Sequence, residues 1–141
     1  ACALEKMIYA LEHHPECSFV YSSFKIGPKV FKSFPFDVER LKKMNYITMS
    51  SLVRRKDHPG FDESLGKFQD WDVWLKMALE GKRGYYIPEL LFTFGENKKG
   101  LSKWLPSIMY KIPWNKFGIH IKQIEQYEKW KKIVQQKHRI I

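Results

Sequence analysis

Apolar side chains recur at a helical spacing in three segments of the chain, residues 3–14, 70–80 and 118–137. Pro15 should end the first predicted helix and Gly81 the second, because neither residue favours a continuing helix. The apolar faces are, in order, Leu4, Met7, Ile8 and Leu11; Trp71, Trp74, Leu75, Ala78 and Leu79; and Ile121, Ile124, Tyr127, Trp130 and Val134. The third helix is amphipathic, with lysines beside its apolar stripe.

Strand-like segments alternate with these helices. Residues 18–24 are aromatic and β-branched, and the Gly27-Pro28 pair after them predicts a turn toward a hairpin partner within residues 29–34. Residues 85–94 also favour a strand, but Pro88 should break its ladder. The alternation of helices and strands predicts an α/β fold.

The connecting segments have less regular patterns. Residues 36–44 favour a short helix, and residues 47–55 fit either a strand or a helix. Residues 57–66 are interrupted by proline and glycine and are expected to form a loop.

Charge is distributed unevenly along the chain. The net charge is +10, from 25 Lys and Arg against 15 Asp and Glu. Residues 1–97 hold 14 basic and 13 acidic side chains, whereas residues 98–141 hold 11 basic and 2 acidic ones. The polar residues 95–100 are therefore the candidate boundary between a near-neutral body (1–97) and a basic, aromatic tail (98–141) that contains the amphipathic helix.

The tail suits an anionic partner. Its lysines and aromatic residues could bind an anionic membrane surface, where each Lys or Arg contributes about 1 kcal/mol. Alternatively, the helix packs its apolar stripe on the body and exposes its lysines to water. No nucleic-acid-binding motif accompanies the charge, so nucleic acid is not expected as a partner.

Targeting and metal-binding patterns are absent from the sequence. No apolar run approaches the roughly 18 residues of a membrane-spanning helix, and the first six residues lack a signal-peptide profile. Cys2 and Cys17 lie outside any CxxC pair, so reduced thiols are expected, although one disulfide could join them. No histidine pairs with acids at ligand spacing, so no metal site is expected in the chain. These features indicate a cytoplasmic protein, in solution or peripherally on a membrane.

Three motifs follow one another in the second third of the chain. They are GFDESL at residues 60–65, DWDVWL at 70–75 and YIPELL at 86–91. Together they resemble the GFDE loop, the EDWD helix and the IPE strand of family 2 glycosyltransferases. FVYS at 19–22 and SSLVRR at 50–55 are similar to two further segments of that family. The resemblance covers residues 3–94.

The resemblance implies a partial GT-A fold, a mixed sheet with flanking helices, in which residues 1–97 are the acceptor-side half. The half that binds the nucleotide-sugar donor is then expected to be missing from this chain, together with the ligands of a divalent cation, Mg or Mn. The expected partners of the full enzyme are a nucleotide-sugar donor and a glycan or lipid-linked acceptor. This chain alone would be inactive.

In the family the Asp of a Glu-Asp pair is the general base, and it corresponds to Asp70. Such a carboxylate takes the proton of the acceptor hydroxyl during an inverting transfer. Gln69 replaces the usual Glu, so the pair is half altered. Alternatively, Asp70 is a helix N-cap worth about 1 kcal/mol, and the helix dipole would lower its pKa.

The same resemblance implies six substrate-binding residues: Arg54, Arg55, Asp62, Glu63, Trp71 and Asp72. Each has a structural alternative. Trp71 lies on the apolar stripe and could belong to the core. Asp72 sits in the first helical turn, where an acid is favourable. The arginines could be solvated surface residues.

A second function class remains open from the sequence. A non-catalytic module could use the basic tail to hold an anionic membrane or a protein partner. A homodimer could also form, if the fragment leaves a sheet edge unpaired.

Overall fold

Strand β1 is the centre of a mixed four-stranded sheet, which pairs it antiparallel with β2 and β3 and parallel with β4. The strands are β1 (Phe19–Ile26), β2 (Lys29–Phe31), β3 (Leu52–Val53) and β4 (Gly84–Phe94). The helices are α1 (Ala3–His13), α2 (Val38–Lys43), α3 (Gln69–Leu79) and α4 (Lys122–Lys137), with short 3-10 turns at Arg55–Asp57, Ser107–Tyr110 and Trp114–Phe117. The computed structural model describes residues 2–95 and 107–141, and within them the fold is mixed α/β, as predicted.

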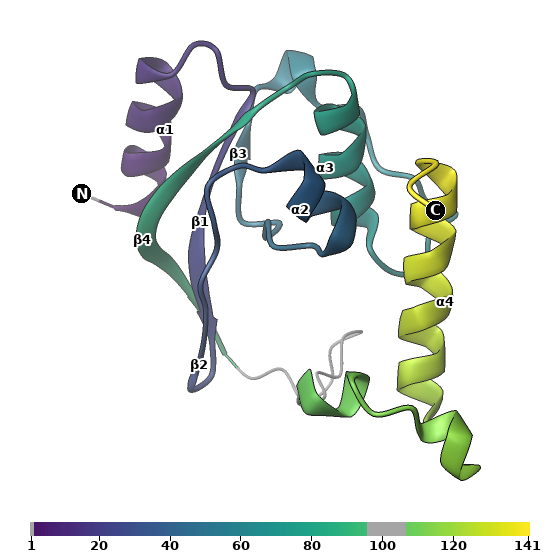
Figure 1. The fold of residues 1–141 in the computed structure, drawn as a ribbon. Coiled ribbons are helices and arrows are strands. Elements are labelled where there is room, and N and C mark those ends of the chain that lie inside the picture. The colour runs from purple at the N-terminus through teal and green to yellow at the C-terminus, as the bar shows by residue number, and fades with distance from the viewer. Residues whose placement is uncertain (1, 96–106) are drawn as a thin grey trace.

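The sheet separates two hydrophobic cores (Figure 1). Alternate residues of β1 point to opposite faces, so that Phe19 and Tyr21 enter the larger core and Val20 the smaller one. Helix α1 covers the smaller core with Met7 and Leu11. Helices α2 and α3 cover the larger core, and α4 packs outside α3.

The C-terminal helix shares the larger core. Val134 is 0% exposed, and Trp130 and Ile133 pack against the same cluster. The second half of the predicted apolar stripe therefore packs on the body, which was one of the two alternatives for this helix. The boundary expected between residues 97 and 98 lies outside the described residues.

Strand β4 runs through Pro88, and its ladder with β1 is interrupted there, as predicted. The strand is continuous, and its register with β1 shifts at the proline, from Ile87 opposite Ser22 to Leu90 opposite Ser23. A bulge accommodates a residue that has no amide hydrogen for the ladder, so the strand bends without ending.

Local boundaries differ from the predictions elsewhere as well, and helix α4, expected from residue 118, begins at Lys122. The ambiguous residues 47–55 contain the short strand β3, and the hairpin partner ends at Phe31. Helix α3 begins at Gln69, with Phe68 at its N-cap in the left-handed region (φ 62°). Asp70 is therefore the second helical residue and not the N-cap.

Both cysteines are free thiols.

Gly84 lies opposite Phe19 in the β1–β4 ladder, and a β-carbon there would overlap the Phe19 ring. Phe19 is fully buried and stacks on Trp74 with 5.0 Å between ring centroids, so it has little room to move. We expect Gly84→Ala to lower the free energy of unfolding by about 1–3 kcal/mol in urea denaturation. Gly95→Ala is the control, because its β-carbon would meet nothing within 4 Å. Equal stability of the two variants would contradict this packing.

Candidate functional site

A pocket of about 350 Å³ lies between the β1–β2 hairpin and the segment that follows α2. Its apolar lining comes from Phe24, Val30, Phe31, Phe34, Met44, Tyr46 and Ile47. Its polar lining comes from Lys32, Asn45, Thr48 and Asp70. The pocket therefore combines an apolar wall with one carboxylate and one cation, which is the usual composition of a small-molecule site.

Asp70 is half-buried, and its carboxylate faces Asn45. Asn45 Nδ2 donates a hydrogen bond of 2.9 Å to Asp70 Oδ2. Burial raises the pKa of Asp70 above its ordinary value, and the hydrogen bonds from Asn45 and from the backbone of Trp71 oppose that rise only in part. A raised pKa makes the carboxylate a stronger base, whereas the helix dipole alone would have weakened it.

Helix α3 positions both members of this pair. Trp71 Nε1 donates to the carbonyl oxygen of Leu41 at 2.7 Å, and Trp74 Nε1 donates to that of Ile47 at 3.1 Å. These two bonds bracket Asn45 and hold its segment against the helix that carries Asp70. The amide is oriented by Asp70, since a carboxylate can only accept. Asn45 Oδ1 is buried and accepts no hydrogen bond from the described residues.

Trp71, predicted to bind substrate, lies in the hydrophobic core. Its side chain is 1% exposed, and its indole N–H is already bonded to Leu41. A sugar ring has no access to this tryptophan, so the core alternative is the one that the structure supports.

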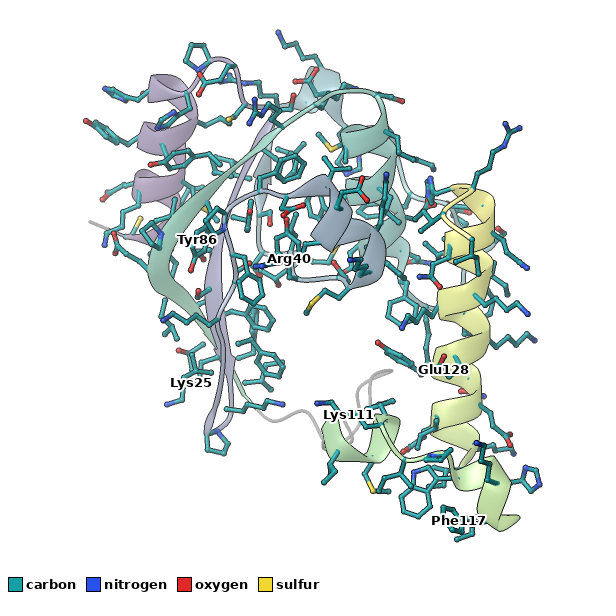
Figure 2. All side chains as sticks on the ribbon, viewed as in Figure 1. Lys25, Arg40, Tyr86, Lys111, Phe117 and Glu128 are labelled. Atoms are coloured by element: carbon teal, nitrogen blue, oxygen red, sulfur yellow. The ribbon has the colours of Figure 1, made fainter. Side chains whose placement is uncertain are left out.

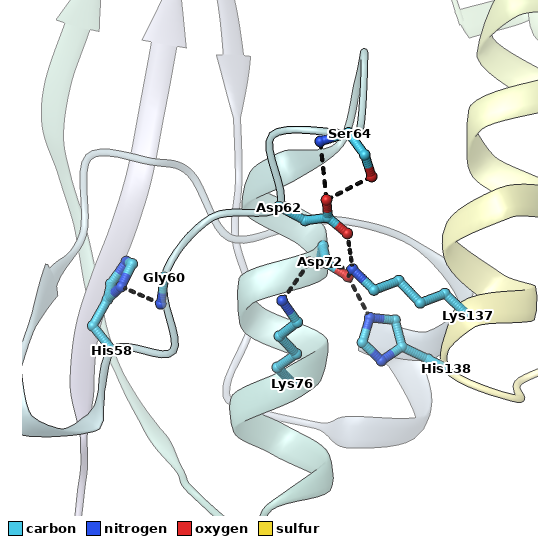
Figure 3. A network of polar contacts seen from close by, with 8 residues as sticks. All are labelled: His58, Gly60, Asp62, Ser64, Asp72, Lys76, Lys137 and His138. Carbon is cyan, nitrogen blue, oxygen red and sulfur yellow. Dashed lines mark hydrogen bonds and ion pairs between the residues drawn. The ribbon is translucent and has the colours of Figure 1, made fainter.

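Asp72, also predicted to bind substrate, is 0% exposed and faces α4 (Figure 3). Lys76 Nζ and Lys137 Nζ lie 3.0 and 2.9 Å from its oxygens, and His138 Nε2 lies 2.7 Å from Oδ1. Burial acts to raise the pKa of Asp72, but the hydrogen bonds from Lys137, Lys76 and His138 together outweigh it and hold the pKa below its usual range. The residue fastens α4 to α3.

Asp62 belongs to the same polar cluster. It accepts from the Ser64 backbone at 3.0 Å and from Lys137 Nζ at 2.5 Å. The bond from Lys137, followed by those from Ser64, lowers the pKa of Asp62. Glu63, its neighbour, is exposed, and neither residue lines the Asp70 pocket. Their substrate-binding role stays a prediction.

Arg54 and Arg55 lie away from the pocket, beyond the start of β1. Arg54 donates to the carbonyl oxygens of Cys17 at 2.9 Å and Leu11 at 2.5 Å, and so joins α1 to the sheet. Two nitrogens of its guanidinium, Nε and Nη2, are bonded to backbone carbonyls, and its role in binding substrate stays a prediction. Arg55 is exposed, and its role stays a prediction.

Sequence reasoning missed the other polar residues of the pocket. Asn45 and Lys32 belong to no motif, and Asn45 lies 25 residues before the carboxylate that it contacts. The predicted hairpin includes Lys32. No local sequence pattern, however, shows that this hairpin lies beside α3, which carries Asp70.

A second hollow, of about 540 Å³, lies between α1 and β4. Its lining includes Lys6 and Glu89, which form an ion pair, and Tyr9 stacked on His13. The charges of Lys6 and Glu89 therefore neutralise each other, and the Tyr9 and His13 rings contact each other. The smaller pocket is therefore the better candidate site, because its carboxylate has no cationic partner among the described residues.

The Asp72 cluster generates a stability prediction. Asp72→Asn should lower the free energy of unfolding at pH 7 by about 3 kcal/mol, because Lys137 and His138 lose their buried anion. The pKa of Asp72 is lower in the folded state, so its stabilisation is present above about pH 4 and is lost as the pH falls through the folded-state pKa. The difference between wild type and variant should shrink accordingly in urea denaturation below pH 4.

Glu63→Gln is the control, since this exposed carboxylate should change stability by less than about 0.5 kcal/mol. A constant difference between wild type and Asp72→Asn at every pH would argue against the ion-pair account.

Two features are absent from the residues that the structure describes. No three His, Cys, Asp or Glu side chains among them converge to hold a metal ion, so they do not form a site for the divalent cation that the resemblance implies for the full enzyme. None of the helices in this part of the chain combines the length and the apolar character needed to cross a bilayer.

Comparison with models of known protein families finds no match. Comparison with curated protein sequences finds no significant match either.

Proposed function

We propose that this chain is the acceptor side of an inverting glycosyltransferase, with Asp70 as the general base. The observation that carries the proposal is the Asp70 carboxylate, which lines an open pocket and has no cationic partner among the described residues. The motifs around it resemble those of family 2 glycosyltransferases and supply the reaction class.

The reaction would proceed in one displacement. Asp70 takes the proton of the acceptor hydroxyl while that oxygen forms a bond to the anomeric carbon of the donor sugar. The bond from the anomeric carbon to the nucleoside diphosphate breaks on the opposite face, and the electron pair leaves with the diphosphate. A divalent cation held by the donor-binding part would neutralise the charge on this leaving group.

The pocket walls support this role for Asp70. The apolar side chains of Phe24, Phe31 and Ile47 limit the water around the carboxylate, which keeps its pKa raised. Asn45 holds the carboxylate in one orientation through its Oδ2 atom. Such a group accepts a proton better than a solvated aspartate.

Asp70→Asn tests the base directly. In the full enzyme, supplied with nucleotide-sugar donors and acceptor, the rate of sugar transfer should fall by at least about 100-fold. Folding should not suffer, because the raised pKa means that burying the carboxylate costs stability at neutral pH, and the amide removes that cost. Transfer is measured with radiolabelled donor, and stability by thermal denaturation.

Asp57→Asn is the matched control, since Asp57 lies in the 3-10 turn outside the pocket. It should retain transfer activity. If Asp70→Asn transfers sugar near the wild-type rate, Asp70 is not the base and the proposed function loses its main support.

Asn45 allows a separate test of how the carboxylate is tuned. A general base must be deprotonated, so transfer should decline as the pH falls below the pKa of Asp70, at a midpoint above the ordinary value of about 4. The hydrogen bond from Asn45 lowers that pKa, so Asn45→Leu should move the midpoint to higher pH. The profile of kcat/KM against pH measures this shift. An unchanged midpoint would separate Asn45 from the titrating group.

A further inference from the structure

Two segments at one end of the molecule carry several lysines. They are the β1–β2 hairpin (residues 24–34) and residues 107–122, both at the lower end of the molecule as drawn in Figure 1. These two segments, which we call the basic end, contain six lysines and no Asp or Glu. The lysines are Lys25, Lys29, Lys32, Lys111, Lys116 and Lys122.

Large apolar side chains are exposed among these lysines. Phe117 is 70% exposed and Ile108 65%, and Val30 and Ile119 are also exposed. Figure 2 shows Lys25, Lys111 and Phe117 at this end. A single exposed apolar residue is ordinary on a protein surface, but several of them interspersed with cations are typical of a surface that binds at a lipid interface.

The positive charge of the basic end is largely uncompensated. Within residues 2–95 and 107–141, no ion pair involves Lys25, Lys32, Lys111 or Lys116. Some lysines elsewhere on the surface are paired, as in Lys42 with Glu39 and Lys82 with Glu80, and within the basic end His120 contacts Glu125 of α4. The basic end is thus complementary to a surface of fixed negative charge.

We propose that the basic end binds the surface of a membrane that contains anionic lipids. Phe117 and Ile108 enter the boundary between headgroups and acyl chains, and the lysines contact headgroup phosphates. This places the contact on the hairpin and the short turns. The stripe of α4 is not available for it along its second half, because Val134 and Trp130 pack on the body.

The hairpin also connects this surface to the candidate site. Val30, Phe31 and Lys32 line the Asp70 pocket and belong to the same hairpin. A bound membrane would therefore lie beside the pocket. The inference does not depend on the transferase proposal, because membrane binding is measured without donor or acceptor.

Vesicle sedimentation with the whole chain tests the proposal. The protein should sediment with vesicles of phosphatidylcholine and phosphatidylglycerol in equal parts, but not with phosphatidylcholine alone, and binding should weaken as salt is added. Lys111→Glu combined with Lys116→Glu should weaken binding at least about thirtyfold. Phe117→Ser should weaken it about tenfold.

Lys56→Glu combined with Lys132→Glu is the matched control. It makes the same change in net charge at exposed positions outside the basic end, and it should weaken binding less than about threefold. All of these side chains are exposed, and circular dichroism should show unchanged melting for every variant. Lys25→Glu supplies an independent variant on the hairpin.

Three results would overturn the proposal. The first is that wild type fails to sediment with the anionic vesicles at low salt. The second is that the control pair weakens binding as much as Lys111→Glu with Lys116→Glu, which would indicate attraction by net charge alone. The third is that Phe117→Ser binds normally while polyuridylate RNA displaces the protein from the vesicles, which would assign the surface to nucleic acid.

Discussion

Two indole N–H groups on α3 hold the segment between α2 and β3 in place, and the candidate site depends on them. Trp71 donates to the carbonyl oxygen of Leu41 in α2, and Trp74 donates to that of Ile47 in the irregular segment, so the chain is fixed on both sides of Asn45. The same tryptophans are buried in the core beside Phe19 of β1. Packing and hydrogen bonding thus act through the same side chains, and Asn45 reaches Asp70 as a result.

The three consecutive residues of the DWD motif, Asp70, Trp71 and Asp72, lie in chemically different surroundings on one turn of α3. Asp70 faces the pocket, Trp71 the core and Asp72 the helix α4. Two residues along a helix correspond to a rotation of about 200°, so the two carboxylates point to nearly opposite sides. One has a raised pKa because burial dominates, and the other a lowered pKa because three cationic or hydrogen-bonding groups surround it. The first suits proton transfer, and the second joins α4 to the body.

The docking of α4 also determines which basic surface remains available. With Val134 in the core and Lys137 bound to Asp62 and Asp72, the C-terminal part of the tail is a structural element. The uncompensated lysines and exposed apolar residues lie instead at the hairpin and at residues 107–122. The hairpin contributes residues both to this surface and to the lining of the Asp70 pocket.

Local pattern alone determined the helices, the central hairpin and the α/β class, because side-chain periodicity and the Gly27-Pro28 turn act over a few residues. The resemblance of residues 60–91 to family motifs, which is also local in sequence, identified Asp70 as a candidate base. Only the tertiary structure decided that Asp72 and Trp71 are buried, that Arg54 is bound to the backbone, and that Asn45 contacts Asp70. Burial and pairing depend on segments tens of residues apart, and no local spacing records which of them meet.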